Sequence, residues 1–172
     1  MFEGTHYKSW SGLRKSMTGM LCDKLQGRVD YSLARYHKVH NSYGKAAILV
    51  DRSECVIFTW REMYQQDQDM GAEWDFEKGL LPKEKMLNRK WNEDKILSDY
   101  DFLTSATNYL QMAVKVALES DDYLIRIFAI MDRRVGRKRL DEIWNSGSWR
   151  DLPEWVRQFY RLRFHNSLLE KL

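Results

Sequence analysis

The sequence predicts an α+β protein, with a small three-stranded antiparallel meander near the N-terminus packed with a mainly helical C-terminal half. Residues 28–60 hold short β-rich runs with alternating hydrophobicity, whereas the apolar residues after position 98 recur at the spacing of helix faces. Hydrophobic residues make up 44% of the 172 positions, which is close to the globular average. A chain of this length and composition can bury a substantial core.

We expect a single domain over residues 1–172. The sequence has two prolines and nine glycines, and it shows no Ser/Gly-rich linker and no internal repeat. The expected parts are a helix plus β-meander at 9–61, a variable acidic connection at 62–97 and a helical part at 98–172.

Three strands are expected in the N-terminal part. Apolar and polar residues alternate over residues 28–38, which is typical of a half-buried strand. Further β-rich runs at 45–51 and 54–60 are separated only by Arg52 and Ser53. This spacing predicts a hairpin, although its turn lacks the usual glycine.

The helices follow from apolar spacing and from residues that favour helix ends. Asp99 and Ser120 are expected to act as N-caps, and Gly136 is expected to give a left-handed C-cap or a bend. Pro153 favours a helix start nearby. The predicted helices cover residues 9–25, 99 to about 117, 121 to about 135, 137–144 and 151 to about 169.

A cluster of cations follows the apolar helix that begins near residue 121. Five of the seven residues from 133 to 139 are Arg or Lys, and the last helix adds three more arginines. Grouped guanidinium groups favour phosphates and carboxylates, so the cluster predicts a site for an acidic partner. The alternative is that these side chains solvate a helix face and cap helix ends. The predicted binding residues are Arg133, Arg134, Arg137, Lys138, Arg139, Arg157, Arg161 and Arg163.

A second basic stretch lies on the first predicted strand, where Arg35, His37 and Lys38 alternate with other side chains. A sheet face of this kind can stack bases and hold phosphates. An ordinary edge strand also uses cations, because they discourage edge-to-edge aggregation. We favour the edge strand and keep the three residues as candidate binding residues.

The net charge is only +3, although two blocks of the sequence are basic and the block between them is acidic. Residues 1–61 carry ten Lys/Arg and five Asp/Glu, residues 62–101 carry six and eleven, and residues 126–163 carry ten and five. Such blocks either pair with each other inside the fold or present separate faces to different partners.

The sequence shows no glycine-rich phosphate loop, no GxSxG elbow, no HExxH and no paired CxxC, so we expect no metal ion and no cofactor. A metal site would have to gather Cys22, His37, His40 and Cys55, whose spacing matches no zinc pattern. Two distant cysteines favour a reducing compartment rather than a disulfide framework.

A nuclease site is the other catalytic arrangement that we considered. It would combine Asp30 or Asp51 with Glu93 and Lys95, but the last two do not lie on a β-rich run. The longest apolar run, residues 46–50, is far too short to span a bilayer, so we expect a cytoplasmic protein with no membrane partner.

Several stretches together resemble a known family. They are SWSGLRK at 9–15, the segment 21–40 that ends in ARYHKVH, residues 100–118, and LIRIFAIMDRRVGRKRL at 124–140, with WVRQFYRLR at 155–163 in keeping. The sequence resembles a family of uncharacterised bacterial proteins that pair SWSxLRK, GRV and ARYHK segments with a later DRRVGxxRL motif. The resemblance implies a bacterial cytosolic origin and assigns no activity.

Three functions remain open from the sequence. The leading one is a non-catalytic binding module whose Arg/Lys surface binds an acidic protein or a nucleic acid. The second is an inhibitor or immunity-type protein that uses its acidic segment at 62–101. The third is an enzyme whose site is not recognisable from sequence, which would require a deep pocket that holds His37 or His40 beside an acid.

Overall fold

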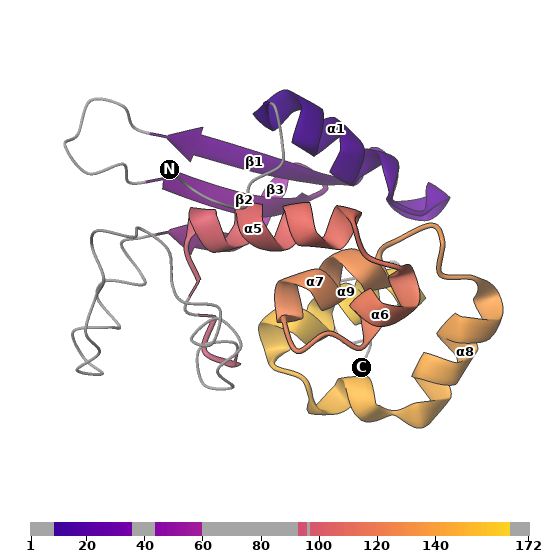
Figure 1. Cartoon of the computed structure of the whole chain (residues 1–172). Helices are drawn as coiled ribbons and strands as arrows, with labels where there is room; N and C mark the ends of the chain where they lie inside the picture. Colours follow the sequence, from indigo (N-terminus) through magenta and orange to yellow (C-terminus); the bar gives the residue numbers. More distant parts are fainter. Residues whose placement is uncertain (1–8, 36–43, 60–92, 96, 166–172) are drawn as a thin grey trace.

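The computed structural model describes residues 9–35, 44–59, 93–95 and 97–165. It shows a three-stranded antiparallel sheet followed by a mainly helical half (Figure 1), so the predicted α+β class is confirmed. In chain order the elements are α1 (Trp10–Gly19), η1 (Asp23–Leu25), β1 (Val29–Arg35), β2 (Gly44–Val50), β3 (Ser53–Thr59), α5 (Asp99–Leu110), α6 (Val114–Leu118), α7 (Tyr123–Ile130), α8 (Arg137–Ser146), η2 (Ser148–Asp151) and α9 (Glu154–His165).

The strands pair in the order β1-β2-β3, as expected for a meander. The hairpin between β2 and β3 turns at Asp51 and Arg52, whose φ angles of 51° and 70° are both left-handed. Positive φ at both central residues is typical of the tight turns that match strand twist. The Asp51 carboxylate also accepts hydrogen bonds of 2.8 and 2.7 Å from the Arg28 guanidinium, which ties the turn to the start of β1.

Helix α5 lies between the sheet and helices α6, α7, α8 and α9, whereas α1 packs beside β1 (Figure 1). Phe102 on α5 is fully buried, and its ring centroid lies 5.7 Å from both Phe58 of β3 and Phe128 of α7. The ring of Tyr31 on β1 lies 6.1 Å from Phe102. One aromatic side chain therefore joins the sheet to the helical half, and burial of such rings supplies much of the core's stability.

The N-terminal helix is shorter than expected. It ends at Gly19, and the chain then forms the short 3₁₀ helix η1, whereas the sequence predicts one helix to residue 25. Gln26 donates side-chain hydrogen bonds to the carbonyls of Thr18 and Leu21, which holds the chain in a tight turn there. Ser9 caps the helix start by accepting from the Gly12 amide at 3.2 Å.

Two predicted N-caps shift in the structure. Ser98, rather than Asp99, caps α5, because Ser98 and Asp101 form a reciprocal capping box. Asp122, rather than Ser120, caps α7 by accepting from two backbone amides in the first turn, while the Ser120 hydroxyl accepts from the Asp122 amide.

Two predicted connections also differ. The helix expected from 99 to about 117 is broken after Leu110, where the amides of Gln111 and Met112 bond to carbonyls three residues earlier. Gly136 has a φ of −74° and precedes α8, so of the two expected alternatives the left-handed C-cap is wrong and only the bend remains. Gly147, at the end of α8, is left-handed instead, with a φ of 68°. The predicted end of the last helix, near residue 169, lies outside the described residues.

No helix in the described part of the chain is long and apolar enough to cross a membrane.

Gly44 is required by close packing between β2 and α5. A Cβ at this buried position would overlap the Asp99 carboxylate, so Gly44→Ala is expected to lower the free energy of unfolding by about 1–3 kcal/mol. Gly19→Ala is the matched control, because no heavy atom lies within 4 Å of its added Cβ. Thermal unfolding of the two variants checks this prediction, and equal melting temperatures would contradict it.

Candidate functional site

The basic segment after α7 lies beside the connection between α1 and η1. The Cys22 amide donates to the Met131 carbonyl at 2.9 Å, and the Arg133 amide donates to the Met20 carbonyl at 2.8 Å. The two segments are more than one hundred residues apart in the sequence, so this bridge joins the N-terminal part to the helical half. The backbone that carries the cations is therefore held in place.

Asp132 is the buried carboxylate at the centre of this segment, and its side chain is fully inaccessible. It accepts from the Arg134 amide at 2.7 Å and from Arg134 Nη2 at 2.7 Å. The Tyr109 hydroxyl of α5 also donates to this carboxylate. Burial and this bond raise the pKa of Tyr109, while the hydrogen bond from Arg134 to Asp132 raises the pKa of the guanidinium. The carboxylate is thus satisfied by donors from two parts of the fold.

Arg134 consequently has a structural role. Its guanidinium lies over the Tyr109 ring, 5.9 Å from the centroid, and forms three hydrogen bonds with the Asp132 carboxylate. Breaking a buried pair leaves an uncompensated charge, so this arginine is not available to a partner without a large cost.

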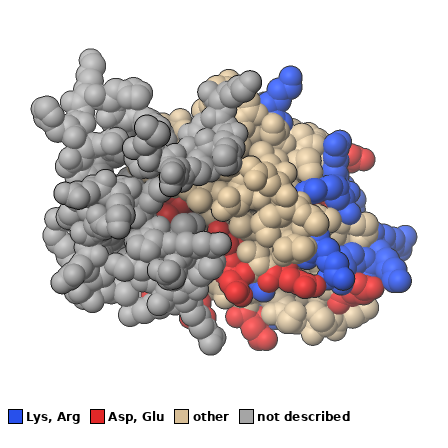
Figure 2. All heavy atoms as spheres, in the orientation of Figure 1, with Lys and Arg blue, Asp and Glu red and all other residues tan. Residues whose placement is uncertain are grey.

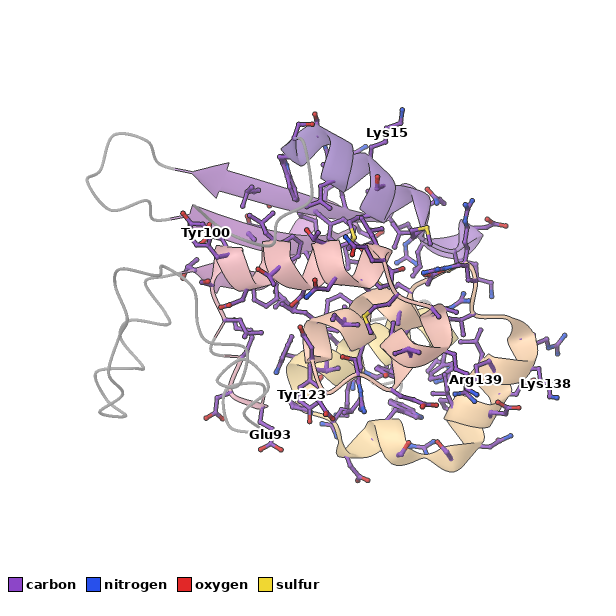
Figure 3. All side chains as sticks on the ribbon, viewed as in Figure 1. Lys15, Glu93, Tyr100, Tyr123, Lys138 and Arg139 are labelled. Atoms are coloured by element: carbon purple, nitrogen blue, oxygen red, sulfur yellow. The ribbon has the colours of Figure 1, made fainter. Side chains whose placement is uncertain are left out.

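Arg139 is also engaged within the molecule. It bridges Glu119, which follows α6, at 2.8 Å and Glu142 of α8 at 3.1 Å. All three side chains are at least one-third exposed, so each pair contributes little to stability. Figure 3 shows Arg139 near the start of α8.

The arginines of α9 pair with groups of the same molecule. Glu154 accepts from Arg157 at 2.8 Å and also from Arg161, which is only 5% exposed. The hydrogen bond from Arg161 is the main reason why the pKa of Glu154 lies below its ordinary value. Arg163 Nη2 donates to the Val135 carbonyl at 3.0 Å, which joins α9 to the segment before α8. These contacts stabilise the packing of α9.

Arg133, Arg137 and Lys138 remain, and we call these three residues the loop cations, because Arg133 lies in the loop before α8 and Arg137 and Lys138 open that helix directly after it. All three are exposed, and none of their side chains forms a hydrogen bond or an ion pair with any described residue. Figure 3 shows Lys138 projecting away from the body of the protein, and Figure 2 shows Lys and Arg atoms gathered along the same edge. The structure therefore separates the predicted cluster into paired and unpaired cations.

The other predicted binding residues are only partly described. The backbone of Arg35 pairs with Gly44 at the end of β1, which lies at an edge of the sheet, and His37 and Lys38 lie outside the described residues. The same is true of His40, so the enzyme alternative that depends on these histidines stays a prediction.

The described members of the considered catalytic and metal sets have other partners or stand free. Asp30 pairs with Arg14, and within residues 9–35, 44–59, 93–95 and 97–165 no group of three His, Cys, Asp or Glu is arranged to hold a metal ion. Cys22 is buried and free, and Cys55 Sγ donates to the Ile48 carbonyl at 3.3 Å. Burial raises the pKa of the Cys55 thiol to about 11, so the thiolate is disfavoured at neutral pH.

The described end of the acidic segment contributes buried carboxylates. Asp99 and Asp101 are both fully inaccessible, so they present no acidic face to a partner. Asp101 accepts from the Ser98 amide at 2.7 Å and from its hydroxyl at 3.0 Å. Burial raises the pKa of Asp101 to about 7, and the charges of Asp122 and Asp99 act in the same direction. Residues 62–92 of this segment lie outside the described part.

Sequence reasoning missed two features of the site. Asp132 and Tyr109 hold the basic segment in place, and their only sequence signal is one acid directly before Arg133 and Arg134. Arg126, inside the apolar helix α7, also lines a pocket together with Arg139. A single cation in an apolar helix gives no sign of which surface it faces.

Comparison with protein families gives a match between residues 9–164 and the model of the SF0329 protein family. The matched range includes the sheet and all the described helices except the last residue of α9. The comparisons with curated proteins and with solved structures gave no match.

Replacing Asp132 tests whether this carboxylate holds the basic segment. Asp132→Ala leaves the Tyr109 hydroxyl and the Arg134 guanidinium without their acceptor, so we expect a loss of about 3 kcal/mol or more in unfolding free energy. Asp141→Ala removes an exposed acid of α8 and should change stability by less than about 0.5 kcal/mol. Urea unfolding measures both, and similar midpoints would refute the role of Asp132.

The buried Asp101 should make stability depend on pH. Its folded pKa of about 7 exceeds the ordinary value of 3.8, so between these values the folded state keeps a proton that the unfolded state loses. The free energy of unfolding is therefore expected to fall as the pH rises from about 4 to about 7. Asp101→Asn keeps an oxygen for Ser98 and should flatten this slope.

In the Asp101→Asn variant, part of the pH dependence of stability should remain, because burial also raises the pKa of Asp122. Chemical unfolding at a series of pH values checks the prediction, with Asp141→Asn as the control. Equal slopes for the parent and Asp101→Asn would contradict it.

Proposed function

We propose that this chain, which belongs to the SF0329 protein family, is a non-catalytic binding module for an acidic partner. The observation that supports the proposal is the set of loop cations, Arg133, Arg137 and Lys138, whose side chains are exposed and have no partner among the described residues. A negatively charged partner can contact them without breaking an existing ion pair.

The backbone around the loop cations favours binding because it is ordered before a partner arrives. Arg133 follows Asp132 and shares the backbone bridge to Met20, and Arg137 begins α8. Binding then orders only the side chains, which lowers the entropic cost of association. By contrast, binding through the other predicted arginines would break hydrogen bonds or ion pairs within the molecule. These arginines are Arg134, Arg139, Arg157, Arg161 and Arg163.

A nucleic acid and an acidic protein both meet this charge requirement. We place nucleic acid first because Arg and Lys side chains neutralise phosphates, and such contacts supply much of the affinity for nucleic acid. We also propose that the protein is bacterial and cytoplasmic. The motif resemblance and the two free cysteines support that origin.

The triple variant Arg133→Gln, Arg137→Gln, Lys138→Gln tests the proposed function. Binding of single- and double-stranded oligonucleotides across a salt series is the measurement, because phosphate contacts release counterions. We expect the affinity of the parent to fall linearly with salt on a log–log plot. The triple variant should bind weakly, and on a duplex its slope should be shallower by roughly 0.9 for each phosphate that it no longer neutralises.

Arg139→Gln is the matched control, since it removes a cation of the same cluster that is already paired with Glu119 and Glu142. It should bind almost as the parent does. If the parent binds no oligonucleotide at low salt, polyglutamate serves as the probe for an acidic protein partner. Unchanged binding by the triple variant, with either probe, would rule out the loop cations as the site.

A further inference from the structure

A pocket of about 470 Å³ lies between α6, α7, α8, η2 and α9. This volume is within the range of sites that hold small molecules. Its apolar lining comes from Leu118, Ile143, Trp149, Leu152 and Tyr160. The pocket lining includes none of the loop cations, so its chemistry is separate from that of the proposed partner surface.

Two stacked aromatic rings form part of the apolar lining. The rings of Trp149 and Tyr160 are parallel within 1°, and their centroids lie 6.0 Å apart. Both side chains are more than 90% buried, so their positions are fixed by the surrounding helices. Rigid aromatic walls of this kind suit a ligand with a flat apolar body.

The pocket is also lined by charged side chains, which differ in whether they are paired. Arg139 lines the pocket but is paired with Glu119 and Glu142, which line it too. Arg139 and the two glutamates carry a net charge of −1, so the four charged groups at the pocket, Arg126 included, sum to zero; among them only Arg126 has no carboxylate partner among the described residues. Arg126 is therefore the group of the pocket whose charge is free to pair with an anionic ligand.

Arg126 is held in a fixed orientation. Its Nε–H donates to the Ser120 carbonyl, and its guanidinium lies 5.8 Å from the centroid of the Tyr123 ring. Figure 3 labels Tyr123 on α7, one helical turn before Arg126. The N–H groups on both Nη atoms form no hydrogen bond with any described residue. A half-buried guanidinium with its end free is arranged to donate two parallel bonds to a carboxylate.

We infer that this pocket binds a small molecule with a flat apolar body and one carboxylate group. The carboxylate contacts the two Nη atoms of Arg126, and the apolar body lies against Trp149 and Tyr160.

The test uses 2-naphthoate as the probe and 2-naphthamide, which has the same shape without the charge, as the matched control. Titration calorimetry with the full chain should show saturable binding of the carboxylate. The amide should bind about tenfold more weakly or worse, since it lacks the charge-assisted pair. Equal affinity for the two compounds, or no binding of naphthoate, would overturn the inference.

Three variants locate the binding site. Arg126→Gln should abolish the preference for the carboxylate, whereas Arg133→Gln, outside the pocket, should leave naphthoate binding unchanged. If Arg126→Gln does not fold, Ser146→Phe decides, because it fills the pocket from an exposed position on α8 and keeps Arg126. Full naphthoate affinity in folded Arg126→Gln, or in Ser146→Phe, would place the site elsewhere.

Discussion

The buried carboxylate of Asp132 is the contact on which the arrangement of the helical half depends. It accepts hydrogen bonds from Tyr109 on α5 and from the backbone and guanidinium of Arg134. The backbone on either side of it bonds to Met20 and Cys22, so the same short segment also holds the end of α1. A buried acid without these donors would be strongly unfavourable, which means that the carboxylate and its donors must be present together. The position of Arg133 follows from this contact rather than from its own side-chain interactions.

The sequence predicts the sheet well because strand patterning and hairpin turns are local properties. The two later strands begin and end within about one residue of the expected bounds, and their order is a simple meander. The helix break after Leu110 was missed because no proline or glycine marks it. The cap of α5 was misplaced by one residue because Ser98 and Asp99 are both good N-caps, and only the contact between Ser98 and Asp101 decides between them.

The sequence predicts the candidate site as a set of cations, but it does not show which of these cations are paired within the molecule. Charge counting treats Arg134, Arg139 and Arg137 alike, although the first two have acceptors and the third has none among the described residues. The pair between Arg139 and Glu142 is visible as a spacing of three on one helix face. The bond from Arg139 to Glu119 is not, because it joins residues twenty positions apart, one on α8 and one just after α6. Pockets such as the one beside Arg126 form between several elements, so periodicity within one helix does not reveal them.

Helix α8 connects the two proposed sites, because Arg137, Lys138 and Arg139 are consecutive in its first turn. The first two belong to the loop cations, and the third forms part of the pocket wall. No residue of α8 is fully buried, so this helix is held by half-buried side chains such as Leu140 and Ile143 and by exposed ion pairs. Exposed pairs contribute less than about 1 kcal/mol each, which is small beside the burial that holds α5 and α7. The position of α8 is therefore the part of the helical half that depends least on the core, and contacts from a bound partner or ligand have most influence there.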